Sequence, residues 1–434
     1  MTYVQAPGRH RRRTSRSLAA TMAVLLLVMV APLAAVDWVG TARADQPAGP
    51  DPTAPGPHRV SAVAYDLGDT AFPLEGFQIE LAGTVYYPAD LGDGGRPMVL
   101  MAHGLFATCA DREAAADRAE ARGRLFGPDP IQDPAERERL EKILAEAEEQ
   151  LGRWPCAPGV EPVPSNRGFD YLARHLASHG FVVVSIGANG INAGSAVGAD
   201  DFRVRAALMN KHLAMWQQLV ASGAGPLAGR FGDVDFTGRV DLTNVGTLGH
   251  SRGGRGAMNH AANEHRDQWP AGVQIKAVVP LEPVLPGGDD VVTRIPFATV
   301  IGACDFVSNS GAKDYFEAAK DANTARIHQF FVHGANHSFF NTEWSPSSGQ
   351  VTAEDDANSR VEPPLPAPGH CRTTGEPIVD EKQLTEEEQR RVGVGYISAF
   401  FRRYLAGETA FDALLTGLDH PLGAVDVEFD DPAA

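Results

Sequence analysis

The sequence predicts an α/β fold in which a mostly parallel central sheet is covered by helices on both faces. From about residue 77, short β-rich runs alternate with longer stretches of helical spacing, as in strand–helix–strand units. Several of the β-rich runs are apolar throughout, which is typical of strands buried on both faces. The 434 residues are 43% hydrophobic and 21% charged, so a full globular core is available and a disordered or fibrous chain is excluded.

The segment before this domain is predicted to direct export. The apolar run Leu18–Val36 follows a cluster of arginines, and the small-residue motif Ala42-Arg43-Ala44 follows the run. This order is typical of a secretory signal peptide, here residues 1–44, and implies a secreted, extracellular protein that keeps no stable membrane anchor after cleavage. A retained anchor is the alternative, because the run is nearly long enough to span a bilayer. Residues 45–57, rich in Pro, Ala and Gly, predict a flexible linker.

The predicted domain spans residues 58–407, and its elements follow one another in strand–helix order. The first strand alternates polar and apolar residues, and the later strands are short apolar runs bounded by loops. Strands are expected at Phe77–Tyr87, Pro97–Ala102, Phe181–Ile186, Asn244–Leu248, Ala277–Leu281, Phe297–Ile301 and Ile327–Val332. Helices are expected where apolar residues recur every three or four positions, at Phe169–Ser178, Phe202–Val220, directly after Ser251 and at Glu386–Tyr404. Residues 408–434 carry little pattern and are assigned to a C-terminal tail.

An acidic, charge-dense insertion at residues 111–151 interrupts the strand–helix order. Its apolar residues fall at helical spacing and are Leu140, Ile143, Leu144, Ala147 and Leu151. This spacing predicts a helical hairpin inserted after the 97–102 strand. Such a hairpin is either a lid over a binding site or a solvated excursion from the domain.

The four cysteines predict two disulfides if the protein is exported. Four cysteines allow three pairings. The pairs Cys109–Cys156 and Cys304–Cys371 are favoured because each would close a long loop and restrict the unfolded chain. Free buried thiols are the alternative. The chain has no CxxC pair and no His/Cys cluster with metal-ligand spacing, so a structural zinc site is not expected.

A Gly-x-Ser-x-Gly motif at Gly249–Gly253 carries the clearest chemical signal. A predicted strand leads into it and a predicted helix leaves it. A serine exposed on such a tight strand-to-helix turn needs glycine two residues before and two residues after it, because larger side chains would collide. The new helix also points its N-terminus at the turn, which favours negative charge developing there. We therefore predict Ser251 as a nucleophile; an ordinary glycine turn is the alternative.

A nucleophilic serine needs a base, and the base needs an orienting acid. In the chain order serine, acid, histidine, the acid should follow a late strand and the histidine the next strand. Asp305 follows the strand expected at 297–301, and His337 follows the one expected at 327–332. These two residues are therefore the predicted acid and base.

By the order of the expected strands, several other residues could be the acid or the base. His333 is a second possible base, but it lies close to the strand end. The residues that follow the preceding strand offer other acid positions: Glu282, Asp289 and Asp290. Asp314 is expected on a solvated helix face, and core packing is the expected role of His250.

Two backbone N–H groups are predicted to stabilise an oxyanion at the serine. One belongs to Arg252, the residue after the nucleophile. The other belongs to Leu105, because His103-Gly104 follows the 97–102 strand and Gly104 allows the loop to turn inward. A plain turn is the alternative for His103-Gly104. Three aromatic residues are candidates for an acyl-side wall or for the core: Phe106, Phe339 and Trp344.

With the elbow serine, the acid and the histidine in this order, the chain over residues 77–405 resembles the α/β-hydrolases. Its hexapeptide Gly249–Gly254 is similar to that of chlorophyllases. His103-Gly104 and the export signal resemble those of secreted bacterial polyester hydrolases, cutinase-like lipases and the platelet-activating-factor acetylhydrolase group. The pairs Cys304-Asp305 and Asn336-His337 match pairs found in secreted bacterial hydrolases.

The resemblance implies a secreted serine hydrolase that cleaves carboxylic esters through an acyl-enzyme intermediate, without a cofactor. Its site residues would be Ser251, Asp305 and His337, with Leu105 and Arg252 as oxyanion donors. Polyester hydrolases usually carry Met where this chain has Arg252, and compact cutinases lack an insertion like residues 111–151. The resemblance therefore does not decide between a small-molecule ester and a polymeric ester as the substrate. The net charge of −17 opposes a nucleic-acid partner. A monomer is expected. An acyltransferase, a peptidase or an inactive surface protein with the same fold are the alternatives.

Overall fold

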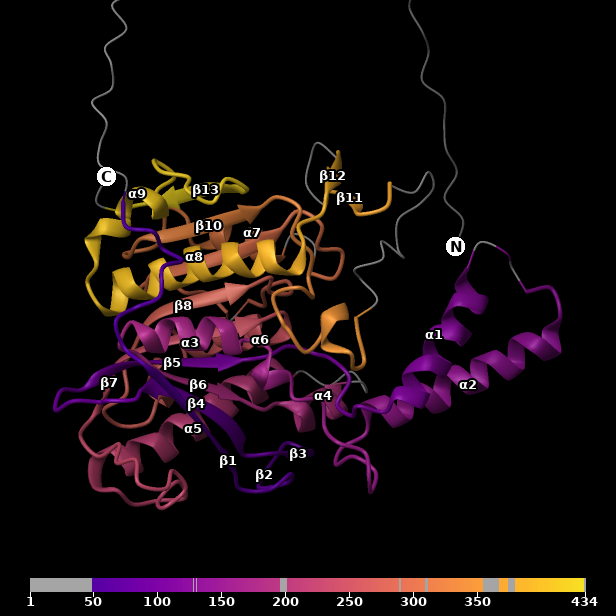
Figure 1. The fold of residues 1–434 in the computed structure, drawn as a ribbon, viewed down its shortest axis with the longest axis horizontal. Helices are drawn as coiled ribbons and strands as arrows, with labels where there is room; N and C mark the ends of the chain where they lie inside the picture. The colour runs from indigo at the N-terminus through magenta and orange to yellow at the C-terminus, as the bar shows by residue number, and fades with distance from the viewer. Residues whose placement is uncertain are drawn as a thin grey trace, which may run out of the picture. The chain divides into compact units, whose positions relative to one another are not determined.

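The protein is a mixed α/β structure with a large, mostly parallel central sheet, as the strand–helix alternation predicts (Figure 1). The computed structural model describes residues 49–127, 129, 131–195, 201–288, 290–308, 311–353, 367–373 and 379–432. The signal peptide expected at 1–44 lies outside these residues. Within the described part of the chain, no helix is both long enough and apolar enough to cross a membrane.

Over the described residues, the central sheet has nine strands in the order β1-β4-β6-β5-β7-β8-β9-β10-β13. Neighbouring strands are parallel from β6 to β10 across the middle of the sheet, whereas β1, β4 and β13 pair antiparallel at its two edges. The bounds of its strands are β1 Val60–Asp66, β4 Ala82–Pro88, β5 Arg96–Ala102, β6 Val182–Ile186, β7 Val240–His250, β8 Ile275–Leu281, β9 Phe297–Gly302, β10 Ile327–Val332 and β13 Val425–Asp430. Two small antiparallel pairs accompany it, β2 Phe72–Leu74 with β3 Phe77–Ile79, and β11 His370–Arg372 with β12 Asp380–Lys382.

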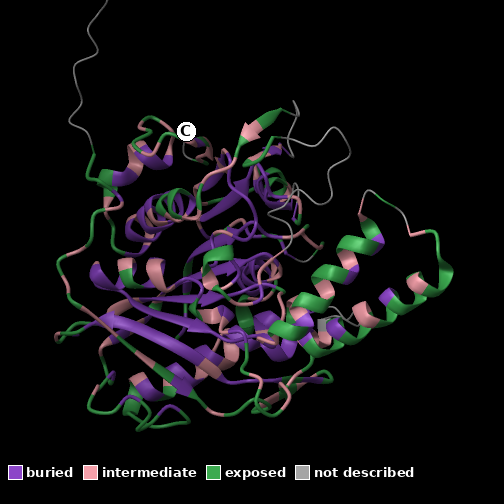
Figure 2. Cartoon of the chain, turned by 45° about the vertical axis from the view of Figure 1, so that its right-hand side comes forward, coloured by how far each residue is buried: buried purple, intermediate pink, exposed green. Residues whose placement is uncertain are grey.

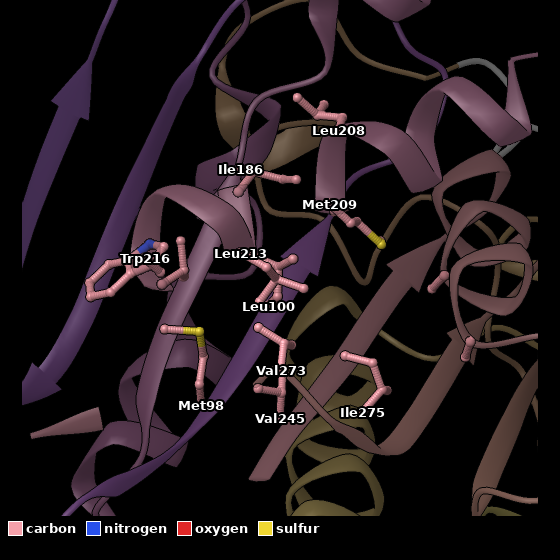
Figure 3. Close-up of a cluster of buried hydrophobic side chains, with 14 of the residues drawn as sticks. Met98, Leu100, Ile186, Leu208, Met209, Leu213, Trp216, Val245, Val273 and Ile275 are labelled. Atoms are coloured by element: carbon pink, nitrogen blue, oxygen red, sulfur yellow. The ribbon is translucent and has the colours of Figure 1, made fainter. Parts of the chain in front are cut away.

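Helices cover both faces of the sheet and divide the core into two apolar layers. Helices α3 and α8 pack on one face, and α5, α6 and α7 pack on the other (Figure 1). Figure 3 shows the second layer, where Trp216 and Leu213 of α5 contact side chains of the parallel strands. The helix bounds are α3 Asp170–Ser178, α4 Asn189–Ser195, α5 Phe202–Ser222, α6 Arg252–Ala261, α7 Gly311–Ala319, α8 Glu386–Leu405 and α9 Asp412–Leu415. Burial of both faces explains why the middle strands are apolar throughout.

The insertion forms the expected helical hairpin, α1 Arg112–Phe126 and α2 Pro134–Gly152 (Figure 2). Each helix starts at an aspartate whose carboxylate accepts hydrogen bonds from first-turn N–H groups, Asp111 for α1 and Asp133 for α2. A narrow apolar strip of alanines and leucines joins the two helices, and most other side chains face solvent. At its base the hairpin contacts Phe106 and Val351 of the main domain.

Both favoured disulfides are present. Cys109–Cys156 joins the two ends of the inserted hairpin, and Cys304–Cys371 joins the loop after β9 to β11. In each pair the Cα atoms lie 5.6 Å apart. The second bridge therefore fixes the segment that also carries Asp305.

Three features differ from the sequence expectation. The strand expected at Phe77–Tyr87 is divided into β3 and β4 by Glu80 and Leu81. The buried carboxylate of Glu80 accepts the backbone N–H groups of Asn189 and Gly190. The segment assigned to a C-terminal tail contributes β13, an edge strand paired with β10. The described part of the expected linker is docked on the domain, where Gly56 N–H donates to Ser178 Oγ (2.8 Å).

Candidate active site

Ser251 lies on a sharp turn between β7 and α6 with φ = 57° and ψ = −124°. A positive φ is strained for serine, so the surrounding structure must hold it. A Cβ on Gly249 would collide with the carbonyl of Gly253, and one on Gly253 would lie 2.5 Å from the carbonyl oxygen of His103. Both glycines are therefore required by the turn, as the sequence reasoning expected. The N–H of Ser251 donates to Leu281 O (2.9 Å), which ties the turn to β8.

The loop after β5 lies directly against this serine. A Cβ built on Gly104 would be 2.6 Å from Ser251 Cβ and 3.2 Å from Ser251 Oγ. Only a glycine allows the backbone to approach so closely. The loop predicted to supply an oxyanion donor is therefore adjacent to the serine hydroxyl.

Buried side chains fix the direction of this loop. Arg205 of α5 donates through Nη1 to His103 O (3.2 Å) and through Nη2 to Asn192 Oδ1 (2.6 Å). Asn192 in turn donates through Nδ2 to Gly104 O (3.0 Å). In a trans peptide the N–H points opposite to the carbonyl, so holding Gly104 O turns the Leu105 N–H to the other side of the loop. The sequence reasoning missed Arg205 and Asn192, since nothing local marks them.

His103 is held as a neutral ring with a defined tautomer. Its Nε2 accepts the Ala188 N–H (2.9 Å), so the proton resides on Nδ1, which donates to Gly104 O (2.9 Å). Burial lowers the pKa of His103 to about 3. This ring therefore supports the loop and carries no charge at neutral pH.

Asp305 and His337 lie next to each other, at the ends of β9 and β10 as predicted. His337 Nδ1 is 3.0 Å from Asp305 Oδ2. A carboxylate partner places the ring proton on Nδ1 and leaves the lone pair on Nε2, the state that a general base needs. The two loops are joined by a hydrogen bond from Cys304 N–H to Ala335 O (2.8 Å). Gln389 of α8 binds both backbone groups of Asn336, which fixes the residue before the histidine.

Asp305 is held in its ionised form. Burial alone would raise its pKa, but His337 and the hydrogen bonds from Ser308 outweigh burial and lower the pKa below its ordinary value. The backbone N–H groups of Val307 (2.8 Å) and Ser308 (2.9 Å) donate to Oδ1, and the Ser308 hydroxyl donates to Oδ2. This carboxylate can therefore stabilise an imidazolium on His337.

A second buried carboxylate, that of Glu282, lies close to the same histidine. Glu282 Oε2 is 3.6 Å from His337 Nδ1 and 3.6 Å from His250 Nε2. Glu282 follows β8 with φ = 42°, another strained backbone position. Since Asp305 is nearer to Nδ1 and within hydrogen-bond distance, the geometry favours Asp305 as the acid and places Glu282 beside it.

The ring of His250 lies between the Ser251 turn and His337. This ring lies against that of His337 with centroids 4.6 Å apart, and Ser251 is the next residue in the chain. Both Ser251 and His337 are buried. Between these two described residues no hydrogen bond is formed. In many hydrolases the serine–histidine contact tightens only when substrate binds.

The other candidates lie elsewhere. His333 is at the surface, where it contacts Asp426 (3.0 Å) and Glu381 (3.2 Å). Asp290 binds Arg255 (2.7 Å) away from the histidine, and Asp289 lies outside the described residues. Asp314 is half-buried on α7, within the helix expected for it.

The aromatic candidates gather near the site. The rings of Phe106 and Trp344 are stacked with centroids 4.8 Å apart, and Trp344 also lies 4.9 Å from the His250 ring. Phe339 is half-buried in the loop that follows His337. Phe106 belongs to the small apolar cluster at the base of the insertion.

Among the residues that the structure describes, one group could hold a metal ion, His250, Glu282 and His337, whose ligand atoms lie within 4.8 Å of one another. A cation bound there would compete with Asp305 for Nδ1 of His337. The arrangement therefore suits proton transfer at His337 or metal binding, but not both at once.

Compared with known proteins, the chain matches no protein-family model and no curated protein.

Proposed function

We propose that the protein is a secreted serine hydrolase of the α/β-hydrolase fold that cleaves carboxylic esters. The observation that carries the proposal is the convergence of three chain segments at the carboxyl ends of parallel strands. A strained serine follows β7, and a carboxylate after β9 lies 3.0 Å from an imidazole nitrogen after β10. Such a group has the order and roles of a nucleophile, acid and base. The two disulfides fit an extracellular location.

In the proposed mechanism Ser251 attacks the ester carbonyl while His337 Nε2 takes the hydroxyl proton. Asp305 stabilises the imidazolium that results, and His337 then gives the proton to the departing alkoxide. Water, activated by His337, hydrolyses the acyl-serine and releases the acid. No cofactor takes part in these steps.

The tetrahedral oxyanion is assigned to the N–H groups of Leu105 and Arg252. Removing one such donor typically costs about 3–4 kcal/mol in the transition state. The first turn of α6 adds the partial positive charge of a helix N-terminus beside the same oxygen. Arg205 and Asn192 act on the reaction through the loop and are positioning residues.

The test is hydrolysis of p-nitrophenyl esters of rising acyl-chain length by the mature protein, beside an insoluble polyester film. The proposal expects turnover of at least one p-nitrophenyl ester by the native protein and none above background by Ser251→Ala. Ser222→Ala, which changes an exposed serine at the end of α5, is the matched control and should keep native turnover. Equal turnover by native protein and Ser251→Ala would overturn the proposal. An added alcohol that receives the acyl group faster than water would redefine the enzyme as an acyltransferase.

A further inference from the structure

A hollow of about 360 Å³ lies beside the proposed catalytic residues. Arg252, next to Ser251 in the chain, lines one side, and Ser308, whose hydroxyl binds Asp305, lines another. The remaining wall is largely apolar and includes two partly exposed side chains, Leu285 and Val307. A substrate held at Ser251 would therefore have this hollow within reach.

Two arginines are fixed at this hollow by buried partners. Arg255 donates through Nε to Asp290 (2.7 Å), and its guanidinium carbon lies 3.7 Å from the centre of the Phe202 ring. Arg252 donates through Nη1 to Asp201 (3.1 Å) and lies 5.8 Å from the same ring. The side chains of Asp201 and Asp290 are fully buried. Both guanidinium groups are therefore held in place before any ligand arrives, which reduces the entropy lost on binding.

Most of the donor capacity of these arginines is unused. Arg255 makes its hydrogen bond through Nε alone and Arg252 through Nη1 alone, so their other N–H groups have no hydrogen-bond partner among the described residues. A guanidinium offers five N–H donors in a planar fork that matches a carboxylate. The two residues can thus accept a carboxylate without giving up their aspartates.

The charged side chains that line the hollow are cationic. Asp201 binds both Arg252 and the buried Arg205, and Asp290 binds Arg255. Of the residues that line the hollow, Arg252 and Arg255 carry charge, so a carboxylate entering it would meet two guanidinium groups.

We propose that the hollow binds a carboxylate carried by the substrate, and that the preferred substrates are monoesters of aliphatic dicarboxylic acids. This inference rests on the proposed function. The ester carbonyl would lie at Ser251, the methylene chain would contact the apolar wall, and the terminal carboxylate would meet Arg252 and Arg255. An aliphatic chain fits the Leu285 and Val307 side, and the planar forks fit the carboxylate.

The experiment compares two esters that differ at one end. Mono-p-nitrophenyl adipate carries a carboxylate where p-nitrophenyl hexanoate carries a methyl group, and spontaneous hydrolysis is subtracted from both. We expect kcat/KM to be at least about tenfold higher for the adipate ester, because a hydrogen bond between charged groups is among the stronger ones. Free adipate should inhibit hexanoate hydrolysis competitively.

Variants of Arg255 locate the effect. Arg255→Gln should lower the adipate-to-hexanoate ratio of kcat/KM to about one, and Arg255→Lys, which keeps the charge without the fork, should recover part of it. Arg266→Gln is the matched control, because Arg266 also lies over an aromatic ring, that of Trp269, but outside the hollow. It should leave the ratio at the native value.

The inference is overturned if the native protein hydrolyses the hexanoate ester as well as the adipate ester and free adipate does not inhibit. It is also overturned if inorganic phosphate inhibits at matched ionic strength and adipate does not, since the hollow would then be a phosphate site. Inhibition of native protein by adipate needs no variant, so a poorly folded Arg255→Gln protein does not decide the matter. If neither ester is hydrolysed and Ser251 is inert, the proposed function itself has failed.

Discussion

Gly104→Ala tests the proposed oxyanion loop with a single methyl group. The new Cβ would lie 2.6 Å from Ser251 Cβ and 2.7 Å from the His250 carbonyl oxygen, whereas ordinary contacts begin at 3.4 Å. Neither neighbour is a flexible side-chain end, so the loop and the serine turn must separate by about 1 Å, a displacement that can cost about a hundredfold in rate.

The expected result is a fall in kcat of about 10²–10³-fold with a smaller change in KM, because the Leu105 N–H acts mainly on the transition state. The measurement is steady-state hydrolysis of the best p-nitrophenyl ester, with the melting temperature of each protein recorded. Gly94→Ala is the matched control, because a Cβ there meets nothing within 4 Å. A Gly104→Ala protein that folds and keeps native kcat would show that the loop does not serve the serine.

Three further outcomes are expected. In esterase assays, Asp305→Asn should lower kcat by about 10³–10⁴-fold. Glu282→Gln should lower kcat by less than about tenfold, because Glu282 lies beyond hydrogen-bond distance from His337 Nδ1. The reverse order of the two effects would make Glu282 the acid. Replacing Cys304 and Cys371 with serine should destabilise the fold by about 4 kcal/mol in urea titrations, from closure of a 67-residue loop, and an unchanged midpoint would refute this. The free energy of unfolding should fall as the pH drops below the ordinary histidine pKa, because the unfolded chain then binds protons on histidines that stay neutral in the folded protein. At about pH 5, each buried neutral histidine lowers the free energy of unfolding by on the order of 2 kcal/mol. Burial lowers the pKa of His103, His212 and His260 to about 3, and that of His328 to about 4. A urea midpoint that stays constant down to about pH 5 would contradict the neutral state of these rings.

The parts of the fold that the sequence predicts are those with strong local signals. The parallel strands are apolar runs, the inserted hairpin has helical spacing, and the glycines around Ser251 mark a turn that few other residues could form. Asp305 and His337 could be selected because parallel strands end at the same edge of a sheet, so residues after successive strands meet.

The features that could not be predicted depend on contacts between distant segments. Strand β13 lies at an edge of the sheet and is only partly buried, so its alternating acidic residues resemble those of a solvated tail. Arg205 lies in the first turn of the long helix α5, and only the folded structure brings it to the His103 carbonyl. The position of Glu282 after a strand makes it a possible acid, but only the folded structure shows that it lies 3.6 Å from His337, beyond the nearer Asp305.

Covalent labelling of Ser251 by a fluorophosphonate probe tests the central claim most directly, with the modified peptide identified by mass spectrometry. We expect the native protein to be labelled at Ser251 alone and the label to be lost in Ser251→Ala. We also expect His337→Asn to slow labelling greatly without unfolding the protein. A native protein that stays unlabelled, or that reacts at another serine, would contradict the claim that Ser251 is a nucleophile activated by His337.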